Sequence, residues 1–216
     1  MSGTGQSTIE ELLDRWVLLF PASAARLGDL LPGPPGTHLV GFLYVDLQAG
    51  ISLHVLGTGT PGADGAVTLT SRTGERDRLV LRHGVFKGLQ PQALSAPQRA
   101  ALGLPGLPDW LESYRRRETA PIRRLAWLDP LRCPGYPDDI RFRLARRGMQ
   151  AEVVWGTAWR LAGEDADGFT LIECELLNEP NQDWGVHAGD RVLVRAKPDA
   201  DGGVLVGFAG PVPARD

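Results

Sequence analysis

The stretch FTLIECELLNEPNQDWGVHAGDRVLVRA, residues 169–196, sets two apolar runs on either side of a crowded polar connection. The runs at 169–177 and 191–196 have the length and composition of strands. A turn at Gly189-Asp190 would be enough to close the chain between them. The connection carries more polar and aromatic groups than a turn needs, namely Asn178, Glu179, Asn181, Gln182, Asp183, Trp184 and His187. Because loops on a rigid scaffold often carry recognition groups, we predict that residues 178–187 form a binding surface.

The sequence around this loop predicts a curved C-terminal sheet. Ile140, Phe142 and Leu144 alternate with other residues, as in a half-buried strand. The run 151–161 is a longer strand, on which Val153, Trp155, Thr157 and Trp159 share one face, and we expect both tryptophans in the core. Residues 191–196 and 204–208 form a final hairpin. Strands joined by such short turns favour a small, strongly curved antiparallel sheet or a partly open barrel.

The N-terminal half is predicted to mix helices and strands, which makes the protein α+β. Two overlapping capping boxes, Ser7 with Glu10 and Thr8 with Glu11, precede apolar residues that follow at helical spacing as far as Phe20. We therefore expect an N-terminal helix that Pro21 ends or kinks. Beyond it we expect a helical piece at 23–31, antiparallel strands at 39–47, 51–56, 66–71 and 78–81, and central helices beginning near Ser95 and Asp109.

A candidate domain boundary lies at Thr119-Ala120-Pro121. Residues 1–118 would then form an N-terminal α+β region, and residues 119–216 a small antiparallel sheet domain. In the alternative, both sheets belong to one domain. The segment 122–128 is expected to be a strand or an extended connector, and 129–139 a loop rich in proline.

The composition indicates a folded protein without a strong charge. Hydrophobic residues make up 43% and charged residues 23% of the chain, which excludes global disorder. The net charge of −3 lacks the basic field of a nucleic-acid binder, so we expect no nucleic-acid partner. No apolar run approaches the roughly 18 residues of a membrane span. With no signal peptide visible and only Cys133 and Cys174, we expect a cytoplasmic protein without a disulfide framework.

Residues 57–62, Gly-Thr-Gly-Thr-Pro-Gly, match the spacing of a dinucleotide-binding motif. That motif requires a following helix whose backbone N–H groups face the phosphates. Here Pro61 removes a donor, and residues 67–70 favour a strand. We therefore interpret 57–65 as a flexible hairpin loop and expect no cofactor.

His187 could form an acid–base pair with Glu179, Asp183 or Asp190, because histidine titrates near neutral pH. A nucleophile to accompany such a pair is missing, since Cys174 is expected to be a buried thiol inside a strand. The other histidines show no metal-ligand spacing, so we expect no metal site. The alternative is a purely structural loop whose polar groups hydrogen bond to the backbone. For Trp184 two roles stay open: it caps the end of the barrel, or it contacts a ligand or partner.

Several landmarks of the C-terminal third resemble a bacterial family. They are Val153-Val154-Trp155, the Leu-Leu-Asn-Glu-Pro turn at 176–180, Gly185, and Gly189-Asp190-Arg191-Val192. In this arrangement, residues 150–197 resemble the family catalogued as domain of unknown function 2314. The resemblance implies a compact α+β domain in bacteria, often in immunity or regulatory settings, and implies no catalytic residue.

These features favour a non-enzymatic binding module, with a protein as a possible partner. Its predicted binding residues are Asn178, Glu179, Asn181, Asp183, Trp184 and His187. Two alternatives stay open. The first is an immunity-type protein that neutralises a toxin, for which an acidic net charge would suit a basic partner. The second is a hydrolase or transferase that uses His187 with nearby carboxylates.

Overall fold

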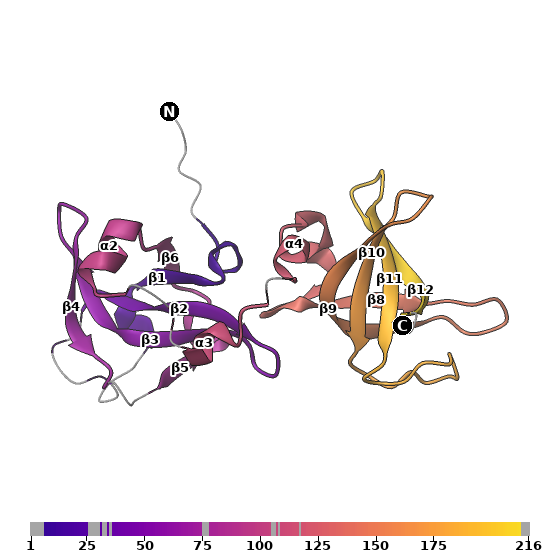
Figure 1. The fold of residues 1–216 in the computed structure, drawn as a ribbon, viewed down its shortest axis with the longest axis horizontal. Coiled ribbons are helices and arrows are strands. Elements are labelled where there is room, and N and C mark those ends of the chain that lie inside the picture. Colours follow the sequence, from indigo (N-terminus) through magenta and orange to yellow (C-terminus); the bar gives the residue numbers. More distant parts are fainter. Residues whose placement is uncertain are drawn as a thin grey trace. The chain divides into compact units, whose positions relative to one another are not determined.

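The computed structural model describes residues 7–25, 31, 34, 36–74, 78–104, 107, 109–116 and 118–212. The chain divides into two compact units, residues 1–115 and 116–216, and each contains one antiparallel sheet (Figure 1). The candidate boundary at 119–121 lies shortly beyond this division. Two antiparallel sheets with short helices make the fold α+β, as predicted. Among the described helices, none combines the length and the apolar character that crossing a bilayer requires.

Unit 1, residues 1–115, is built on a six-stranded sheet. The strands run in the order β4-β3-β2-β1-β6, and β5 also pairs with β3. Their bounds are β1 (Arg15–Phe20), β2 (His38–Asp46), β3 (Gly50–Pro61), β4 (Val67–Arg72), β5 (Leu79–Arg82) and β6 (Gln90–Ala93). The helical elements are η1 (Glu10–Leu12), η2 (Ala22–Ala25), α1 (His83–Phe86), α2 (Ala96–Ala101) and α3 (Asp109–Glu112). The strands predicted in this half and both central helices are confirmed; of the helical piece predicted at 23–31, residues 26–30 lie outside the described part of the chain.

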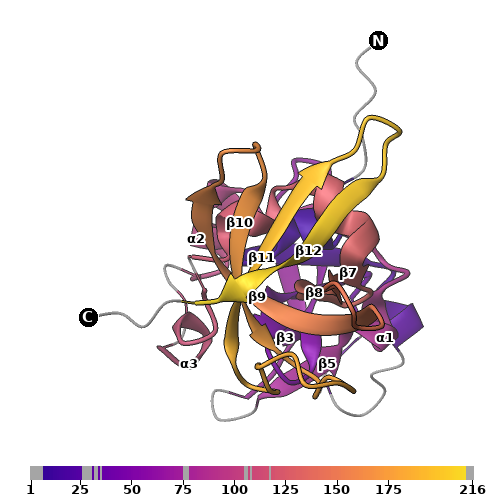
Figure 2. The ribbon, with the colours of Figure 1, turned by 90° about the vertical axis from the view of Figure 1, so that its right-hand side faces the viewer.

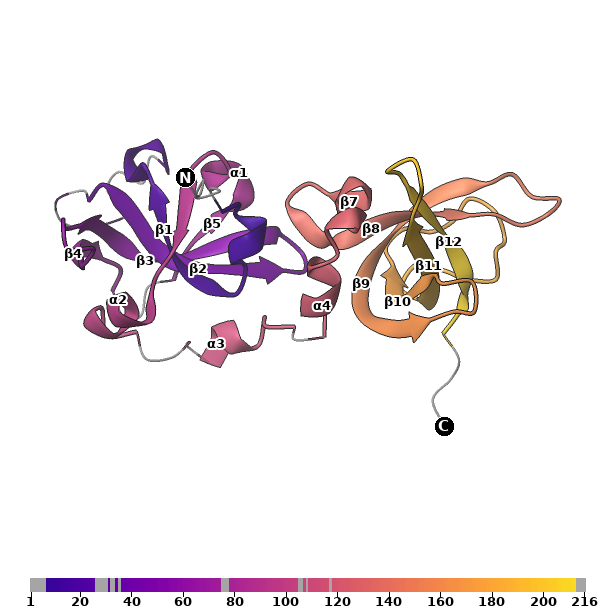
Figure 3. The same cartoon turned by 90° about the horizontal axis from the view of Figure 1, so that it is seen from above.

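Both faces of the unit 1 sheet are buried. On one face Val17 and Leu39 belong to a core cluster with Phe86 of α1. On the other face Trp16 and Phe42 belong to a second cluster, which includes residues of α3 and the segment after α2. Figure 3 shows α1 on one side of the sheet and α2 and α3 on the other. Because neither face is left to solvent, the central strands are apolar almost throughout and do not alternate.

The predicted N-terminal helix is wrong. The capping box does form, since the Glu11 amide donates to Thr8 Oγ1 and the Thr8 amide donates to Glu11 Oε2. The helix that it begins is only the 3-10 turn η1, and Asp14 then takes a positive φ of 60° that directs the chain into β1. The four central residues of β1 are all buried, because each face of the sheet is covered. Such a continuous apolar run matches helical spacing as well as strand spacing, which is why periodicity failed here.

The glycine-rich segment 57–61 is part of strand β3 and not a flexible loop as predicted. A Cβ atom on Gly57 would lie 2.0 Å from the carbonyl oxygen of Ser71, on the neighbouring strand β4. The β3–β4 ladder also shifts register between Thr58 and Gly59. Glycine is therefore required here for a close approach of two backbones at a bulge, which is its usual role inside a strand.

Unit 2, residues 116–216, contains a sheet that curls into a half-barrel (Figure 2). Its order is β12-β11-β10-β9-β8-β7, with register shifts in the β9–β10 and β11–β12 ladders that bend the strands. A Cβ atom on Gly207 of β12 would lie only 3.7 Å from the carbonyl oxygen of Arg143 on β8. The predicted curved sheet is thus confirmed. The strands are β7 (Arg132–Cys133), β8 (Tyr136–Leu144), β9 (Glu152–Glu164), β10 (Thr170–Leu176), β11 (Arg191–Pro198) and β12 (Val204–Pro211).

The face of β9 that points into the half-barrel is the opposite of the one predicted. Val154 and Ala158 are buried in the core, whereas Val153 is 63% exposed. Trp155 and Trp159 are only half-buried, and Trp159 is stacked between the guanidinium groups of Arg116 and Arg191, 3.9 and 3.7 Å from the ring centroid. Indole rings can be covered by arginine stacking outside a core, so their size alone did not identify the buried face.

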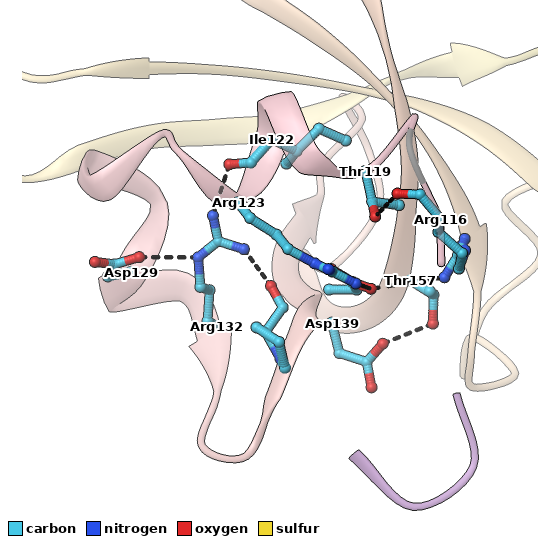
Figure 4. A network of polar contacts seen from close by, with 10 residues as sticks. Arg116, Thr119, Ile122, Arg123, Asp129, Arg132, Asp139 and Thr157 are labelled. Atoms are coloured by element: carbon cyan, nitrogen blue, oxygen red, sulfur yellow. Dashed lines mark hydrogen bonds and ion pairs between the residues drawn. The ribbon is translucent and has the colours of Figure 1, made fainter. Parts of the chain in front are cut away.

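The segment expected as a strand or connector at 122–128 is helical instead. It contains α4 (Ala120–Arg123) and the 3-10 helix η4 (Ala126–Leu131), and Pro121 lies in the first turn of α4, where proline is well tolerated. Within unit 2, arginines attach this segment to the barrel (Figure 4). The Arg123 Nε and Nη2 atoms donate to the two carboxylate oxygens of Asp138 at 2.7 and 2.8 Å.

Replacing Asp138 with Asn is expected to destabilise unit 2. The Asp138 side chain is only 4% exposed and that of Arg123 10%, so the change removes the carboxylate charge that faces a buried guanidinium. Breaking such a buried pair typically costs about 3–5 kcal/mol. The matched control is Asp167→Asn, because the side chains of Asp167 and its partner Arg195 are 73% and 34% exposed, and an exposed pair contributes at most about 1 kcal/mol. Urea unfolding followed by hydrogen exchange in peptides from 118–212 measures both changes, and equal losses would contradict the prediction.

Candidate functional site

The loop predicted as a binding surface, residues 178–187, is folded around a carboxylate from β9. Glu152 accepts hydrogen bonds from the backbone and side-chain amides of Asn181, at 2.8 and 2.9 Å, and from the amide of Gln182 at 3.4 Å. The indole N–H of Trp184 donates to the same carboxylate. These hydrogen bonds, the one from the Asn181 amide foremost, lower the pKa of Glu152.

Trp184 is 2% exposed and belongs to the core of unit 2. Of the two roles expected for it, the structure therefore shows the one that closes the end of the barrel. Other polar groups of the loop are also used by the fold. The side-chain oxygen of Asn178 accepts from the Trp155 amide at 2.8 Å, that of Asp183 accepts from the Gly185 amide at 3.0 Å, and Gln182 is hydrogen bonded to the backbone of Gln150.

His187 and Glu179 form an exposed pair at the end of the loop. The His187 Nδ1 atom lies 2.7 Å from Glu179 Oε1, and the Ala188 amide donates to Glu179 Oε2 at 2.9 Å. The hydrogen bond to Glu179 raises the pKa of His187. Asp190 binds the His187 backbone amide and Asp183 binds that of Gly185, so the structure pairs the imidazole with Glu179 among the three predicted carboxylates.

The two cysteines do not supply an activated thiolate to this pair. Cys174 is a free thiol fully buried in β10, as predicted, and burial raises its pKa. Burial and the nearby Asp139 raise the pKa of Cys133 as well. In the part of the chain that the structure describes, no group of three or more histidine, cysteine or carboxylate residues could hold a metal ion. The polar density that suggested a recognition surface is thus largely accounted for by hydrogen bonds within the loop and to residues 150–155.

Unit 1 contains a more open candidate site, which the sequence analysis missed. It is a cleft of about 420 Å³, within the range of about 300–1,000 Å³ that is usual for ligand pockets. It lies on the face of the sheet that carries α2 and α3 (Figure 3). Its lining comes from the start of β1, from β2 and β6, from α2 and the segment after it, and from α3 with the residues that follow.

The floor of the cleft is apolar. Trp16 and Phe42 meet edge to face with ring centroids 5.5 Å apart, a favourable geometry for two aromatic rings. Leu94 and Leu104 are buried, and Leu107 is half-buried beside them. The floor therefore offers an aromatic and aliphatic surface whose shape is fixed by the sheet beneath it.

The rim of the cleft is charged, with three arginines and two carboxylates. Arg115 donates to Glu112 at 3.0 Å, and both side chains are partly exposed, at 34% and 44%. Arg15 and Arg99 are exposed. Asp14, with its positive φ, lies at the same rim. Backbone strain of this kind occurs often at functional sites, although here it also turns the chain into β1.

An aromatic cluster fixes α3, which forms one wall of the cleft. Trp110 of α3 packs edge to face against His54 and Tyr44, with centroid distances of 4.9 and 6.1 Å. Tyr114 packs on Tyr44 at 5.0 Å, and the guanidinium of Arg78 lies 4.8 Å above the Trp110 ring. Burial is the main reason that the pKa of His54 is lowered and that of Tyr44 raised, the latter to about 12.

The sequence contained a partial signal for this cleft. Trp16 belongs to the apolar run that ends at Phe20, and Trp110 lies in the central helix expected near Asp109; the structure buries the first side chain and half-buries the second. Nothing in one sequence indicates that β1, β2 and α3 meet, because these elements are paired by long-range contacts. The cleft residues come from four separate stretches of chain, so no motif marks them.

Comparison of the chain with protein-family models, curated proteins and solved structures gave no match. The resemblance of residues 150–197 to the domain of unknown function 2314 family stays a prediction.

Trp184→Ala is expected to destabilise unit 2 by about 3–5 kcal/mol, because it removes a buried aromatic ring and leaves a cavity. His187→Ala is expected to lower the urea midpoint far less, since that side chain is 72% exposed. If Trp184→Ala unfolds at the wild-type urea concentration, Trp184 does not close the barrel as described. If only Trp184→Ala abolished binding of a partner, the loss would therefore reflect unfolding of unit 2. Substitutions at Asn181 and His187 are better tests of recognition by the loop.

Acidification is expected to destabilise unit 1 and to stabilise unit 2. Burial lowers the pKa values of His38, His54 and His83 below 6.5 in unit 1, so the unfolded state binds protons more readily and stability falls as the pH drops below 6.5. Glu179 raises the pKa of His187 in unit 2, so the stability it contributes is complete below 6.5 and is lost as the pH rises through the raised value.

Hydrogen exchange in urea at about pH 7.5 and about pH 5.5, corrected for intrinsic rates, measures the two units separately. The control is His187→Gln. This variant should weaken the pH dependence of the stability of unit 2 and leave the pH dependence of unit 1 unchanged. If the free energy of unfolding changed with pH in the same direction in both units, the opposite effects expected from the histidines would be wrong.

Proposed function

We propose that this chain is a non-enzymatic binding protein and that its ligand enters the cleft of unit 1. The cleft supports the proposal because it joins a preformed aromatic floor to a charged rim in one concave site. Concave sites that combine apolar side chains with convergent polar groups are the usual form of ligand pockets. The observation that carries the proposal is the pairing of Trp16 and Phe42 at the base of that cleft.

The residue types around the cleft favour binding over proton transfer. A guanidinium stays protonated at every physiological pH, so Arg15, Arg99 and Arg115 can attract and orient a ligand without exchanging protons with it. Tryptophan, phenylalanine and leucine supply contact area. The three arginines can thus account for specificity and the apolar floor for most of the affinity.

The loop at 178–187 stays a second, predicted recognition surface. Its exposed members are Asn178, Glu179, Asn181, Asp183 and His187, whereas Trp184 is inside the core. The His187-dependent alternative concerns that loop and not the cleft, whereas the immunity-type alternative rests on the acidic net charge of the chain. A toxin gene beside the coding gene would favour the first alternative, and an activity lost in His187→Ala would favour the second.

The proposal is tested with N-phenyl-1-naphthylamine, a neutral aromatic dye whose emission rises in apolar sites. The full-length chain is expected to bind the dye saturably with a stoichiometry near one. Leu107→Trp, which places a larger side chain in the cleft, is expected to weaken binding by at least about tenfold. The control is Leu205→Trp, which makes the same change at a 42% exposed position on β12. Absence of saturable binding, or equal affinity in both variants, would overturn the proposal.

A further inference from the structure

We infer that the ligand of the unit 1 cleft is an amphipathic anion, a small molecule with an apolar body and one acidic group. This inference rests on the proposed binding function of the cleft. It adds the sign of the ligand's charge and the place of its acidic group.

The apolar body fits the floor. Trp16, Phe42 and Leu104 form a continuous surface on the buried side of the cleft. The volume of about 420 Å³ accommodates a body the size of two fused aromatic rings or a medium-length acyl chain. Burial of such a body against aromatic and aliphatic carbon provides affinity without any charge.

The acidic group of the ligand fits the rim because two guanidinium groups of the rim have no partner among the described residues. Within the described residues, the side chains of Arg15 and Arg99 make no hydrogen bond, ion pair or ring contact. Other arginines of unit 1 are engaged: Arg82 pairs with Asp46 at 3.0 Å, and Arg78 covers the ring of Trp110. An acidic ligand would form charge-assisted hydrogen bonds with Arg15 and Arg99, and these are stronger than neutral ones.

A cationic ligand fits less well. The carboxylate of Glu112 already faces Arg115 at 3.0 Å, and Asp14 also has an interaction within the protein. The rim thus has its acidic groups engaged and two of its three basic groups unengaged. Because both arginines are exposed, salt should screen their attraction for the ligand.

The test compares two dyes that differ only in one acidic group. 1-Anilinonaphthalene-8-sulfonate carries a sulfonate on the skeleton of N-phenyl-1-naphthylamine. We expect the full-length chain to bind the sulfonate at least about tenfold more tightly than the neutral dye, and to lose this preference in high salt. Arg99→Gln and Arg15→Gln should each weaken sulfonate binding by about five- to tenfold and leave the neutral dye unaffected.

The matched control is Arg143→Gln, an exposed arginine on β8 in unit 2, which should change neither affinity. Displacement of the neutral dye gives a second readout: decanoate should displace it at concentrations about tenfold lower than decyltrimethylammonium, which has a chain of similar length and a positive charge.

The outcomes separate the two proposals. If neither dye binds, the binding function itself fails. The cleft binds ligands but the inferred charge is wrong if the neutral dye binds and the sulfonate dye binds no more tightly. The same conclusion follows if the Arg15 and Arg99 variants bind the sulfonate dye as the wild type does, or if decyltrimethylammonium displaces the neutral dye better than decanoate.

Discussion

Burial of the unit 1 sheet on both faces is the constraint on which most of this unit depends. The strands β1, β2 and β3 have cores on either side, so a second layer of helices and loops must cover each face. The layer that includes α2, Leu104 and α3 leaves a cleft on its face of the sheet, and the buried side chains of Trp16 and Phe42 form part of the cleft lining. The candidate site thus exists because the layer that covers this face of the sheet leaves a concave gap.

The same constraint limits what the sequence could reveal. Strands with one solvent-facing side, such as β8 with Ile140, Phe142 and Leu144 inside, were recognised by their alternation. The run Trp16–Leu19 has no alternation, and a genuine capping box precedes it, so it matched a helix. In β9 the strand was found but its inward face was assigned wrongly, because Trp159 stacks against arginines outside the core and Trp155 is only half-buried.

The 178–187 loop and the unit 1 cleft differ in how far the sequence indicates them. Residues 178–187 were prominent in the sequence because their polar groups are dense, and the structure uses most of them to hold the loop on Glu152 and to close the barrel over Trp184. The cleft of unit 1 was invisible in the sequence because its residues are ordinary types brought together by long-range pairing. The local density of polar residues therefore reflected the hydrogen bonds that the folded loop needs more than ligand binding. The cleft, with exposed arginines beside buried aromatic side chains, became evident only in three dimensions.

The brevity of α3 has a consequence for how the protein can be dissected. This helix has four residues, far fewer than the roughly 12–15 that an isolated helix needs in water. It persists because Trp110 and Tyr114 are inserted among side chains of the sheet. A shortened chain that stops before Asp109 would retain all six strands of unit 1 yet lack one wall of the cleft. Fragments used to map binding must therefore extend through Arg115, where unit 1 ends.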